Sequence, residues 1–254
     1  MYMKIGIHVP SRERMNRRLT LLTSIITSVK DINNVNVYFG VDEDDPTRKL
    51  IYKVADAIPC LKIVDIKNDH KFIGLGKMWN ICINETDDDI ISMVGDDMVF
   101  HTPGWDEMLI NEFSGNNMPQ DKIKAVHCND DCHGEKLAVN LFCHRKFNDV
   151  MGQFMREEFK INWIDQWLHQ VFNAFGRLKY RGDIMIEHRH WVLGKDKRDK
   201  TAERMAIADA NKISDQLWHD LVDERIKDVE KLSEYLNMRP DWSKVDTGGR
   251  IIDG

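Results

Sequence analysis

The sequence predicts an α/β fold in which a central, mostly parallel sheet is flanked by helices, with a helical C-terminal extension. Two observations predict it. Over the first hundred residues, short apolar runs alternate with segments of helical spacing, which is the pattern of a parallel sheet with crossover helices. Thr201 to Met238 contains neither Gly nor Pro and repeats its apolar residues every three or four positions, as amphipathic helices do.

The first hundred residues are expected to form strands and helices in strict alternation. KIGIHVP has the alternation of a strand and stops at Pro10, and RRLTLLTSIITSV then places its apolar residues at helical spacing. The same patterns recur up to IISMVGDDMVF, an apolar run that contains Asp96 and Asp97. The expected strands are 4–10, 35–42, 61–66 and 90–100, and the expected helices are 17–29, 48–58 and 74–86.

The second half of the chain is less regular. We expect strands at 124–130 and 137–145, a helix at 162–176, an extended segment at 178–191, and one or two helices across 201–238. In the extended segment, His188 and His190 share one face because side chains alternate along a strand. These boundaries predict a main domain over 1–196 and a helical extension over 197–254.

Composition and charge limit the class of protein. Of the 254 residues, 42% are hydrophobic and 31% are charged, as in ordinary globular proteins. No apolar run reaches the roughly 18 residues of a membrane span, and the N-terminus lacks a signal-peptide pattern. Five cysteines form no disulfide framework, which favours a reducing, cytoplasmic location. The net charge of −6 argues against wrapping long nucleic acid, although the arginines of RERMNRR would form either a local basic cleft or a solvated helix face.

Carboxylates follow or interrupt two of the predicted strands. Asp42 ends the second strand, and Asp96 and Asp97 interrupt the fourth. In open parallel sheets the carboxyl ends of the strands meet at one edge, where ligands bind. Two adjacent carboxylates are costly to bury unless a cation or hydrogen-bond donors meet them. The pair therefore marks either a site for Mg²⁺ or Mn²⁺ or a solvated turn, and a histidine ligand from 188 or 190 would favour Mn²⁺.

Other site patterns are weaker. Neither a P-loop nor a GxGxxG motif occurs. Six potential zinc ligands lie within 18 positions, but their C-x3-C-x10-C spacing is not the paired C-x2-C arrangement, so buried reduced cysteines are favoured over a structural zinc site. These six residues are His127, Cys128, Cys132, His133, Cys143 and His144.

A series of short motifs carries a resemblance to a known family. They are HVPSRER, VYFGVDEDD, GLGKMWN, GDDMVFHTPGWDE, INWIDQWLHQV, and IEHRHW followed by GK. In this order they resemble GT-A-fold glycosyltransferases, most closely the family-2-like enzymes, over residues 3–196. The resemblance implies a nucleotide-sugar half at 1–100 and an acceptor half at 101–196. It also implies metal-dependent transfer of a sugar from a nucleotide sugar, above all a UDP-sugar, to a hydroxyl acceptor.

The resemblance implies roles for individual residues as well. Asp97 with His188 or His190 would hold Mn²⁺ or Mg²⁺, and Asp165 would be the general base of an inverting reaction. The sequence departs from the family's D-x-D motif because Gly95 stands where the first Asp is usual. The implied donor-binding residues are Pro10, Ser11, Arg12, Asp42, Asp44, Lys77, Asn80, Asp96 and Lys195.

Several alternatives stay open at this point. The acceptor is a glycan, a protein, or a hydroxymethylated DNA base of a bacterial virus, and the C-terminal helices pack on the domain, cover the acceptor groove or form a homodimer. A nucleotidyltransferase or a non-catalytic metal- or nucleotide-binding module would share the layout, but the loop after the first strand lacks the glycines of a nucleotidyltransferase. Three tryptophans are expected in the core rather than as sugar platforms, namely Trp105, Trp163 and Trp167.

Overall fold

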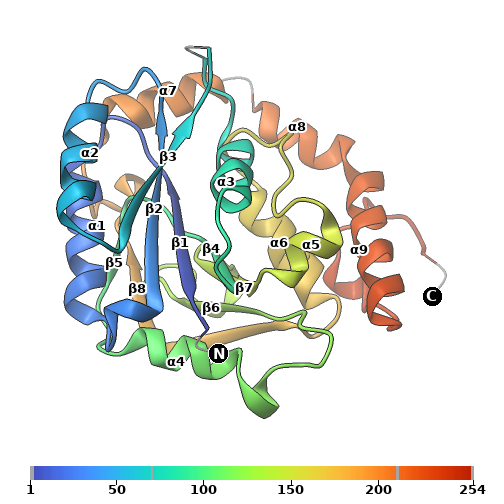
Figure 1. The fold of residues 1–254 in the computed structure, drawn as a ribbon. Coiled ribbons are helices and arrows are strands. Elements are labelled where there is room, and N and C mark those ends of the chain that lie inside the picture. Colours follow the sequence, from blue (N-terminus) through green and yellow to red (C-terminus); the bar gives the residue numbers. More distant parts are fainter. Residues whose placement is uncertain (1–2, 70, 210–211, 253–254) are drawn as a thin grey trace.

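The computed structural model describes residues 3–69, 71–209 and 212–252, which form one eight-stranded sheet between two layers of helices (Figure 1). The strands lie in the order β3-β2-β1-β4-β7-β6-β8-β5. They are β1 (Ile5–Pro10), β2 (Val35–Asp42), β3 (Leu61–Ile66), β4 (Ile90–Met93), β5 (Met98–Phe100), β6 (Ala125–Asn129), β7 (Leu141–His144) and β8 (Leu178–His188). The α-helices are α1 (Met15–Ser28), α2 (Arg48–Ala57), α3 (Leu75–Asn84), α4 (Trp105–Glu112), α5 (Lys146–Met151), α6 (Ile164–Asn173), α7 (Lys200–Ala208), α8 (Ile213–Asp220) and α9 (Val222–Leu236).

The predicted α/β fold with a mostly parallel sheet is confirmed. Strands β3, β2, β1 and β4 run parallel, and β7 is the first strand to run against its neighbour. Alternate side chains of the strands point to opposite helix layers. Ile5 and Ile7 pack with α1, α2 and α4, whereas Ile91 and Met93 pack with α3, α5 and α6. Because both faces are covered, the binding surface of this sheet is the edge where its strands end.

Two sequence predictions about the elements are wrong in detail. The apolar run at 90–100 is not one strand: β4 ends at Met93, the chain turns through Gly95 to Asp97, and β5 pairs antiparallel with β8 at the far end of the sheet. The segment 201–238 forms α7, α8 and α9 rather than one or two helices. Helices α4 and α5 were not expected, since each is shorter than the window in which helical periodicity is visible.

The apolar side of α9, the last helix, is buried against the main domain. Val229 and Leu232 of α9 are fully buried in the core that α3, α5 and α6 share. Arg156 adds an ion pair of 2.6 Å between its Nη2 atom and Asp228 Oδ1. The apolar stripe of α9 is therefore covered within one chain, whereas Ile207 of α7 and Ile213 of α8 are exposed, and the homodimer stays a prediction. No helix in the described ranges is long and apolar enough to cross a membrane.

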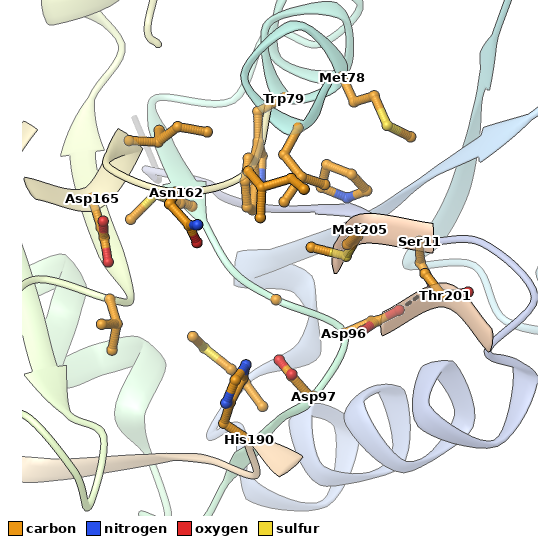
Figure 2. Close-up of a pocket in the computed structure, with 18 of the residues that line it drawn as sticks. Ser11, Met78, Trp79, Asp96, Asp97, Asn162, Asp165, His190, Thr201 and Met205 are labelled. Carbon is orange, nitrogen blue, oxygen red and sulfur yellow. Dashed lines mark hydrogen bonds between the residues drawn. The ribbon is translucent and has the colours of Figure 1, made fainter. Parts of the chain in front are cut away.

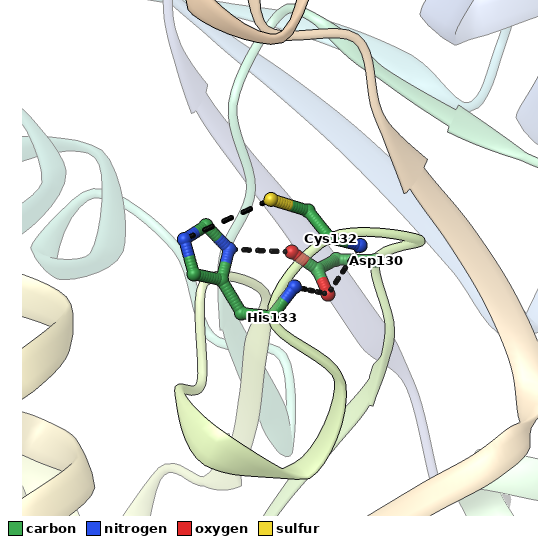
Figure 3. Close-up of side chains that lie close together, drawn as sticks. All are labelled: Asp130, Cys132 and His133. Carbon is green, nitrogen blue, oxygen red and sulfur yellow. Dashed lines mark hydrogen bonds and ion pairs between the residues drawn. The ribbon is translucent and has the colours of Figure 1, made fainter.

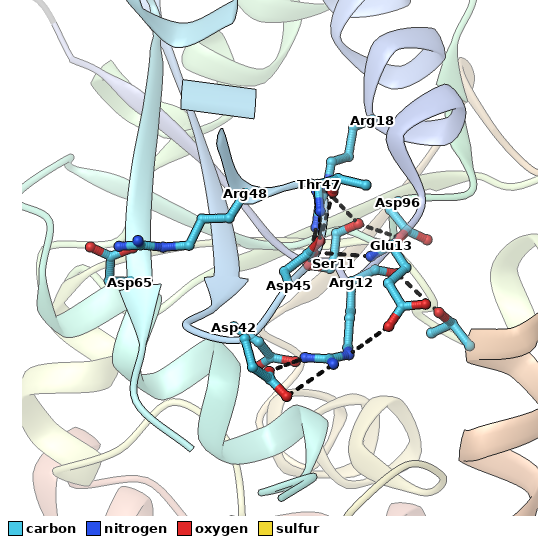
Figure 4. Close-up of polar contacts among 12 residues, drawn as sticks. Ser11, Arg12, Glu13, Arg18, Asp42, Asp45, Thr47, Arg48, Asp65 and Asp96 are labelled. Atoms are coloured by element: carbon cyan, nitrogen blue, oxygen red, sulfur yellow. Dashed lines mark hydrogen bonds and ion pairs between the residues drawn. The ribbon is translucent and has the colours of Figure 1, made fainter. Parts of the chain in front are cut away.

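A buried ion pair fixes the loop that follows β1. The Arg18 Nη2 atom lies 2.7 Å from Asp45 Oδ2, and both side chains are fully buried (Figure 4). Arg18 also donates to Ser11 Oγ over 3.0 Å and to Thr47 Oγ1 over 2.8 Å. The pair thus joins α1 to the turn after β2 and holds the loop at Ser11 in place.

Loss of this pair gives a stability prediction. Asp45→Ala would leave the Arg18 guanidinium buried without its counter-ion, so we expect the free energy of unfolding to fall by about 3–5 kcal/mol. The matched control is Asp65→Ala, which removes the Arg48–Asp65 pair, whose side chains are 39% and 44% exposed. That change should cost about 0–1 kcal/mol. Urea unfolding of the two variants measures the difference, and equal losses would contradict the role given to burial.

Candidate active site

A cavity of about 470 Å³ opens at the carboxyl ends of β1, β2 and β4, where parallel sheets bind ligands (Figure 2). Its wall is formed by the turn after each strand, one side of α3, the start of α6, the end of β8 and one side of α7. The cavity brings together nine of the residues that the sequence singles out: Pro10, Ser11, Arg12, Asp42, Asp96, Asp97, Asp165, His188 and His190.

Asp97 lies beside a histidine from the other end of the sheet. Its Oδ1 atom is 3.4 Å from His188 Nε2, and its Oδ2 atom is 3.7 Å from Arg17 Nη1. The contact arises because Met98 is paired with His188 in the β5–β8 ladder. Burial by itself would raise the pKa of Asp97, but the hydrogen bond and charge of His188 outweigh it and lower that pKa. Asp97 is therefore ionised in a largely buried position.

Asp96 is bound differently from its neighbour. Its carboxylate accepts a hydrogen bond of 2.6 Å from Ser11 Oγ and one of 2.9 Å from Arg14 Nη1. Burial, the largest influence, raises the pKa of Asp96, while Arg14 acts in the opposite direction. With both oxygens already bound to protein donors, Asp96 holds the β1–α1 loop, and Asp97 is the better placed of the two to bind a metal.

The residues at this edge fit a divalent cation. Two neighbouring ligands of an octahedral ion lie about 3 Å apart, close to the 3.4 Å between Asp97 Oδ1 and His188 Nε2. The His188 and His190 rings lie edge to face with centroids 5.2 Å apart. One feature departs from usual metal sites: His188 Nδ1 is buried and has no hydrogen-bond partner within the described ranges, whereas the second nitrogen of a ligand histidine is normally bonded.

Gly95 leaves the space that the Asp97 carboxylate occupies. A Cβ atom at position 95 would lie 2.7 Å from Asp97 Oδ1, too close for a real contact. The glycine that replaces the first Asp of the D-x-D pattern therefore permits the observed Asp97 conformation.

This close approach gives a further prediction. In Gly95→Ala the Asp97 side chain must rotate away from His188, so the metal-dependent nucleotide binding that the sequence resemblance implies should weaken by about tenfold or more, as when a metal's supporting contacts are removed. We expect unfolding free energy to change by less than about 1 kcal/mol, because Ala also lowers the entropy of the unfolded chain. Titration calorimetry with UDP and Mn²⁺ measures the binding, and wild-type affinity in this variant would refute the steric argument.

Asp165 faces Asp96 and Asp97 across the cavity (Figure 2). It lies in the first turn of α6, and its Oδ1 atom accepts a hydrogen bond of 2.8 Å from the Gln166 amide. Burial raises the pKa of Asp165, and the backbone hydrogen bond from Gln166, followed by the nearby imidazoles of His133 and His188, only partly opposes this. A carboxylate with a raised pKa in a cavity is suited to accept a proton.

Four of the predicted donor-binding residues do not line the cavity. Asp44 pairs with Arg12, which also contacts Asp42 over 3.0 Å. Lys77 is exposed on α3. Asn80 is buried, and its side chain bonds the backbone of Met155. Lys195 pairs with Asp131 over 2.6 Å. Asp44 still acts on the site indirectly, because it orients Arg12.

Several lining residues were not singled out from the sequence. They come from α3, from the start of α6 and the segment before it, and from α7, namely Met78, Trp79, Asn162, Gln166, Thr201, Arg204 and Met205. Helix α7 covers the cavity because Asp199, at its N-terminus, forms two bonds of 2.9 Å to Arg14. Opposite charges at 14 and 199 were visible in the sequence, but no local pattern pairs residues so far apart.

The six potential zinc ligands do not gather in one place, as the favoured interpretation of buried reduced cysteines requires. His127, Cys128 and Cys143 are buried in the core, and all five cysteines are free. Among the described residues, the group that could share a metal is Asp130, Cys132 and His133 (Figure 3). Its buried carboxylate is already occupied: Asp130 Oδ1 accepts three backbone N–H groups, and Oδ2 lies 2.9 Å from His133 Nδ1. We therefore assign this cluster to holding the loop after β6.

Known structures share this fold. TarS 1–349 from S. aureus, solved with UDP, is 12% identical with a TM-score of 0.58, and the match covers 72% of this chain and 59% of that one. Mannosyltransferase PcManGT from Pyrobaculum calidifontis, solved with GDP-Man and Mn²⁺, is 10% identical with a TM-score of 0.59 and coverages of 93% and 75%. GalNAc-T7, solved with UDP, GalNAc and Mn²⁺, is 8% identical with a TM-score of 0.59 and coverages of 74% and 44%.

The sequence itself matches no family model and no curated protein. The three structural matches are to proteins of one fold, and the match spans 59% of the TarS chain. The chain therefore has the GT-A fold of nucleotide-sugar glycosyltransferases.

Proposed function

We propose that this protein is a metal-dependent, inverting glycosyltransferase that uses a nucleotide-sugar donor, in first place a UDP-sugar, and a hydroxyl acceptor. One observation carries the proposal: a single cavity presents Asp97 with His188 and His190 on one side and Asp165 on the opposite side. The first set suits a diphosphate-bound cation, and the second suits a base that acts on the acceptor.

The donor side is rich in cations and carboxylates that the nucleotide sugar would contact. Arg12 and Arg14 line the cavity together with Asp42. Asp97 and His188 would hold Mn²⁺ or Mg²⁺, which when bound supplies positive charge to the leaving diphosphate. Arg14 is held by Asp96 and Asp199 at 2.9 Å, so its guanidinium is fixed close to the same place. These groups bind and orient the donor and stabilise the charge that develops as the sugar leaves.

The acceptor side provides the base. Asp165 would take the proton of the acceptor hydroxyl while that oxygen forms its bond to the anomeric carbon and the bond from that carbon to the diphosphate breaks. Because Asp165 lies across the cavity from the diphosphate-binding side, attack would come from the face opposite the leaving group. Such a displacement inverts the anomeric configuration.

Turnover of candidate donors tests the proposal. The protein is incubated with UDP-glucose, UDP-N-acetylglucosamine or GDP-mannose, with and without Mn²⁺, and release of the nucleoside diphosphate is followed. Release that requires Mn²⁺ and one nucleotide sugar supports the proposal. Consumption of nucleoside triphosphates alone, with release of pyrophosphate, would identify a nucleotidyltransferase instead. Binding of nucleotide without any turnover would point to a non-catalytic binding module.

A further inference from the structure

One of the three tryptophans expected in the core, Trp163, is not fully buried. Trp105 and Trp167 are 0% and 3% exposed, as a core position requires. Trp163 is half-buried and lines the cavity two residues before Asp165. A large aromatic side chain beside a candidate base is a common way to bind the ring of a substrate.

The backbone holds Trp163 in an unusual conformation. Its φ angle is 74°, in the left-handed region, which is unfavourable for a bulky residue. The strain places the indole at the N-terminus of α6, where its Nε1 atom donates a hydrogen bond of 2.8 Å to Asp215 Oδ1. Strained residues of this kind persist where the surrounding structure fixes them, and they gather at binding sites.

The C-terminal helices provide the support behind the ring. Trp163 stacks on Trp218 of α8 with centroids 4.7 Å apart and planes 27° from parallel. Trp218 is itself fixed, because its Nε1 atom donates to Asp246 Oδ2 over 2.7 Å and the guanidinium carbon of Arg225 lies 3.9 Å from its ring centroid. One face of Trp163 is thus covered by a rigid stack that residues 213–246 build.

We infer that Trp163 is a platform for the acceptor and that the acceptor is a carbohydrate, which stacks the C–H face of a sugar ring on the indole; this inference rests on the proposed function. The side chains around it suit sugar hydroxyls. Asn162 and Gln166 line the cavity next to Trp163 and Asp165 and offer amide groups for hydrogen bonds.

The charge around the platform favours a neutral ligand over a nucleic acid. The Trp163 indole is bonded to Asp215, and the Asn162 amide donates to Asp209 Oδ2 over 2.7 Å. Asp165 lines this part of the cavity, and the carboxylates of Asp209 and Asp215 bond two of its other lining side chains. A phosphodiester backbone would be repelled there, whereas an uncharged oligosaccharide would not.

Saturation-transfer NMR on the full chain with UDP and Mn²⁺ tests the inference. The carbohydrate probes are cellobiose, lactose and chitobiose, and the nucleic-acid probe is the dinucleotide d(TpT). We expect at least one disaccharide to receive saturation at its ring C–H protons. Trp163→Ala should weaken its binding roughly tenfold or more, while Trp163→Phe should keep most of it because a phenyl ring still stacks. Trp242→Ala, which removes another half-buried tryptophan outside the cavity, should leave sugar binding unchanged.

A parallel thermal melt with UDP and Mn²⁺ separates the two proposals. If UDP and Mn²⁺ raise the melting temperature but no disaccharide binds, the carbohydrate platform is refuted and the proposed function is not. The same conclusion follows if Trp163→Ala binds a disaccharide as tightly as the wild type does. Binding of d(TpT) in place of the disaccharides would refute it in favour of a nucleic-acid acceptor. Sugar binding that depends on Trp163 without any effect of UDP and Mn²⁺ would support the platform and refute the proposed function with a UDP-sugar as donor.

Discussion

Asp165→Asn should lower the rate of sugar transfer by about 10²–10⁴-fold, the usual contribution of a general base. The amide keeps the shape of the side chain and the acceptor of the 2.8 Å bond from Gln166, but it cannot take a proton. Donor binding should persist, because Asp165 lies across the cavity from Asp97 and His190. Single-turnover kinetics with saturating donor measure the chemical step, and calorimetry with UDP and Mn²⁺ measures the retained binding.

The pH dependence of the wild type follows from the same residue. Burial raises the pKa of Asp165, and a base must be deprotonated to act. Activity should therefore fall on the acid side at a higher pH than an ordinary aspartate with a pKa near 3.8 would give. A folded-state pKa above the unfolded value also means that the ionised carboxylate destabilises the fold at neutral pH. Asp165→Asn should consequently melt at the same temperature as the wild type or higher.

The matched control for this variant is Asp149→Asn. Asp149 also lies in the first turn of a helix, but it is exposed on α5 and does not line the cavity. Its replacement should leave the rate of sugar transfer within about twofold of the wild type and should not change the pH at which activity falls on the acid side. An exposed first-turn carboxylate interacts only weakly with its surroundings. Transfer by Asp165→Asn within tenfold of the wild type would remove Asp165 from the role of base.

How far the sequence predicts the site depends on how local each contact is. The edge that gathers Pro10, Asp42 and Asp96 follows from the alternation of strands and helices, because every parallel strand must end at that edge. That Asp97 meets His188 does not follow, since it depends on the pairing of Met98 with His188 across 90 positions. The glycine and the two charges at 95–97 indicate that the strand is interrupted there. They do not indicate that the chain continues as a separate strand, β5, at the far end of the sheet.

The role of the C-terminal segment shows the same limit. Its amphipathic spacing predicts helices, and the direction of the apolar face cannot be read from spacing. In the structure, Met205 of α7 lines the cavity and Trp218 of α8 supports Trp163. Residues 197–252 thus contribute to both sides of the site, although by composition they are an ordinary helical extension.

The adjacent carboxylates Asp96 and Asp97 should respond to replacement in opposite ways. In the wild type, UDP with Mn²⁺ should stabilise the fold by about 2.7 kcal/mol at a hundredfold excess over the dissociation constant, which is more than the sum of the effects of each alone. Asp97→Asn should lose this joint effect and reduce transfer by about 10²–10³-fold, since the charged ligand next to His188 is gone. Melting curves with UDP, with Mn²⁺, with both and with neither give the effect directly.

Asp96→Asn serves as the matched comparison, because it removes the neighbouring charge and keeps the size of the side chain. Asp96 is 5% exposed, and its two carboxylate oxygens accept from Ser11 Oγ and Arg14 Nη1, so the amide leaves one of these two donors without its acceptor oxygen. We expect the melting temperature of the unliganded protein to fall while the joint effect of UDP and Mn²⁺ remains. The reverse outcome, in which Asp97→Asn keeps the joint effect and Asp96→Asn loses it, would make Asp96 the metal ligand and would require Arg14 to move when the donor binds.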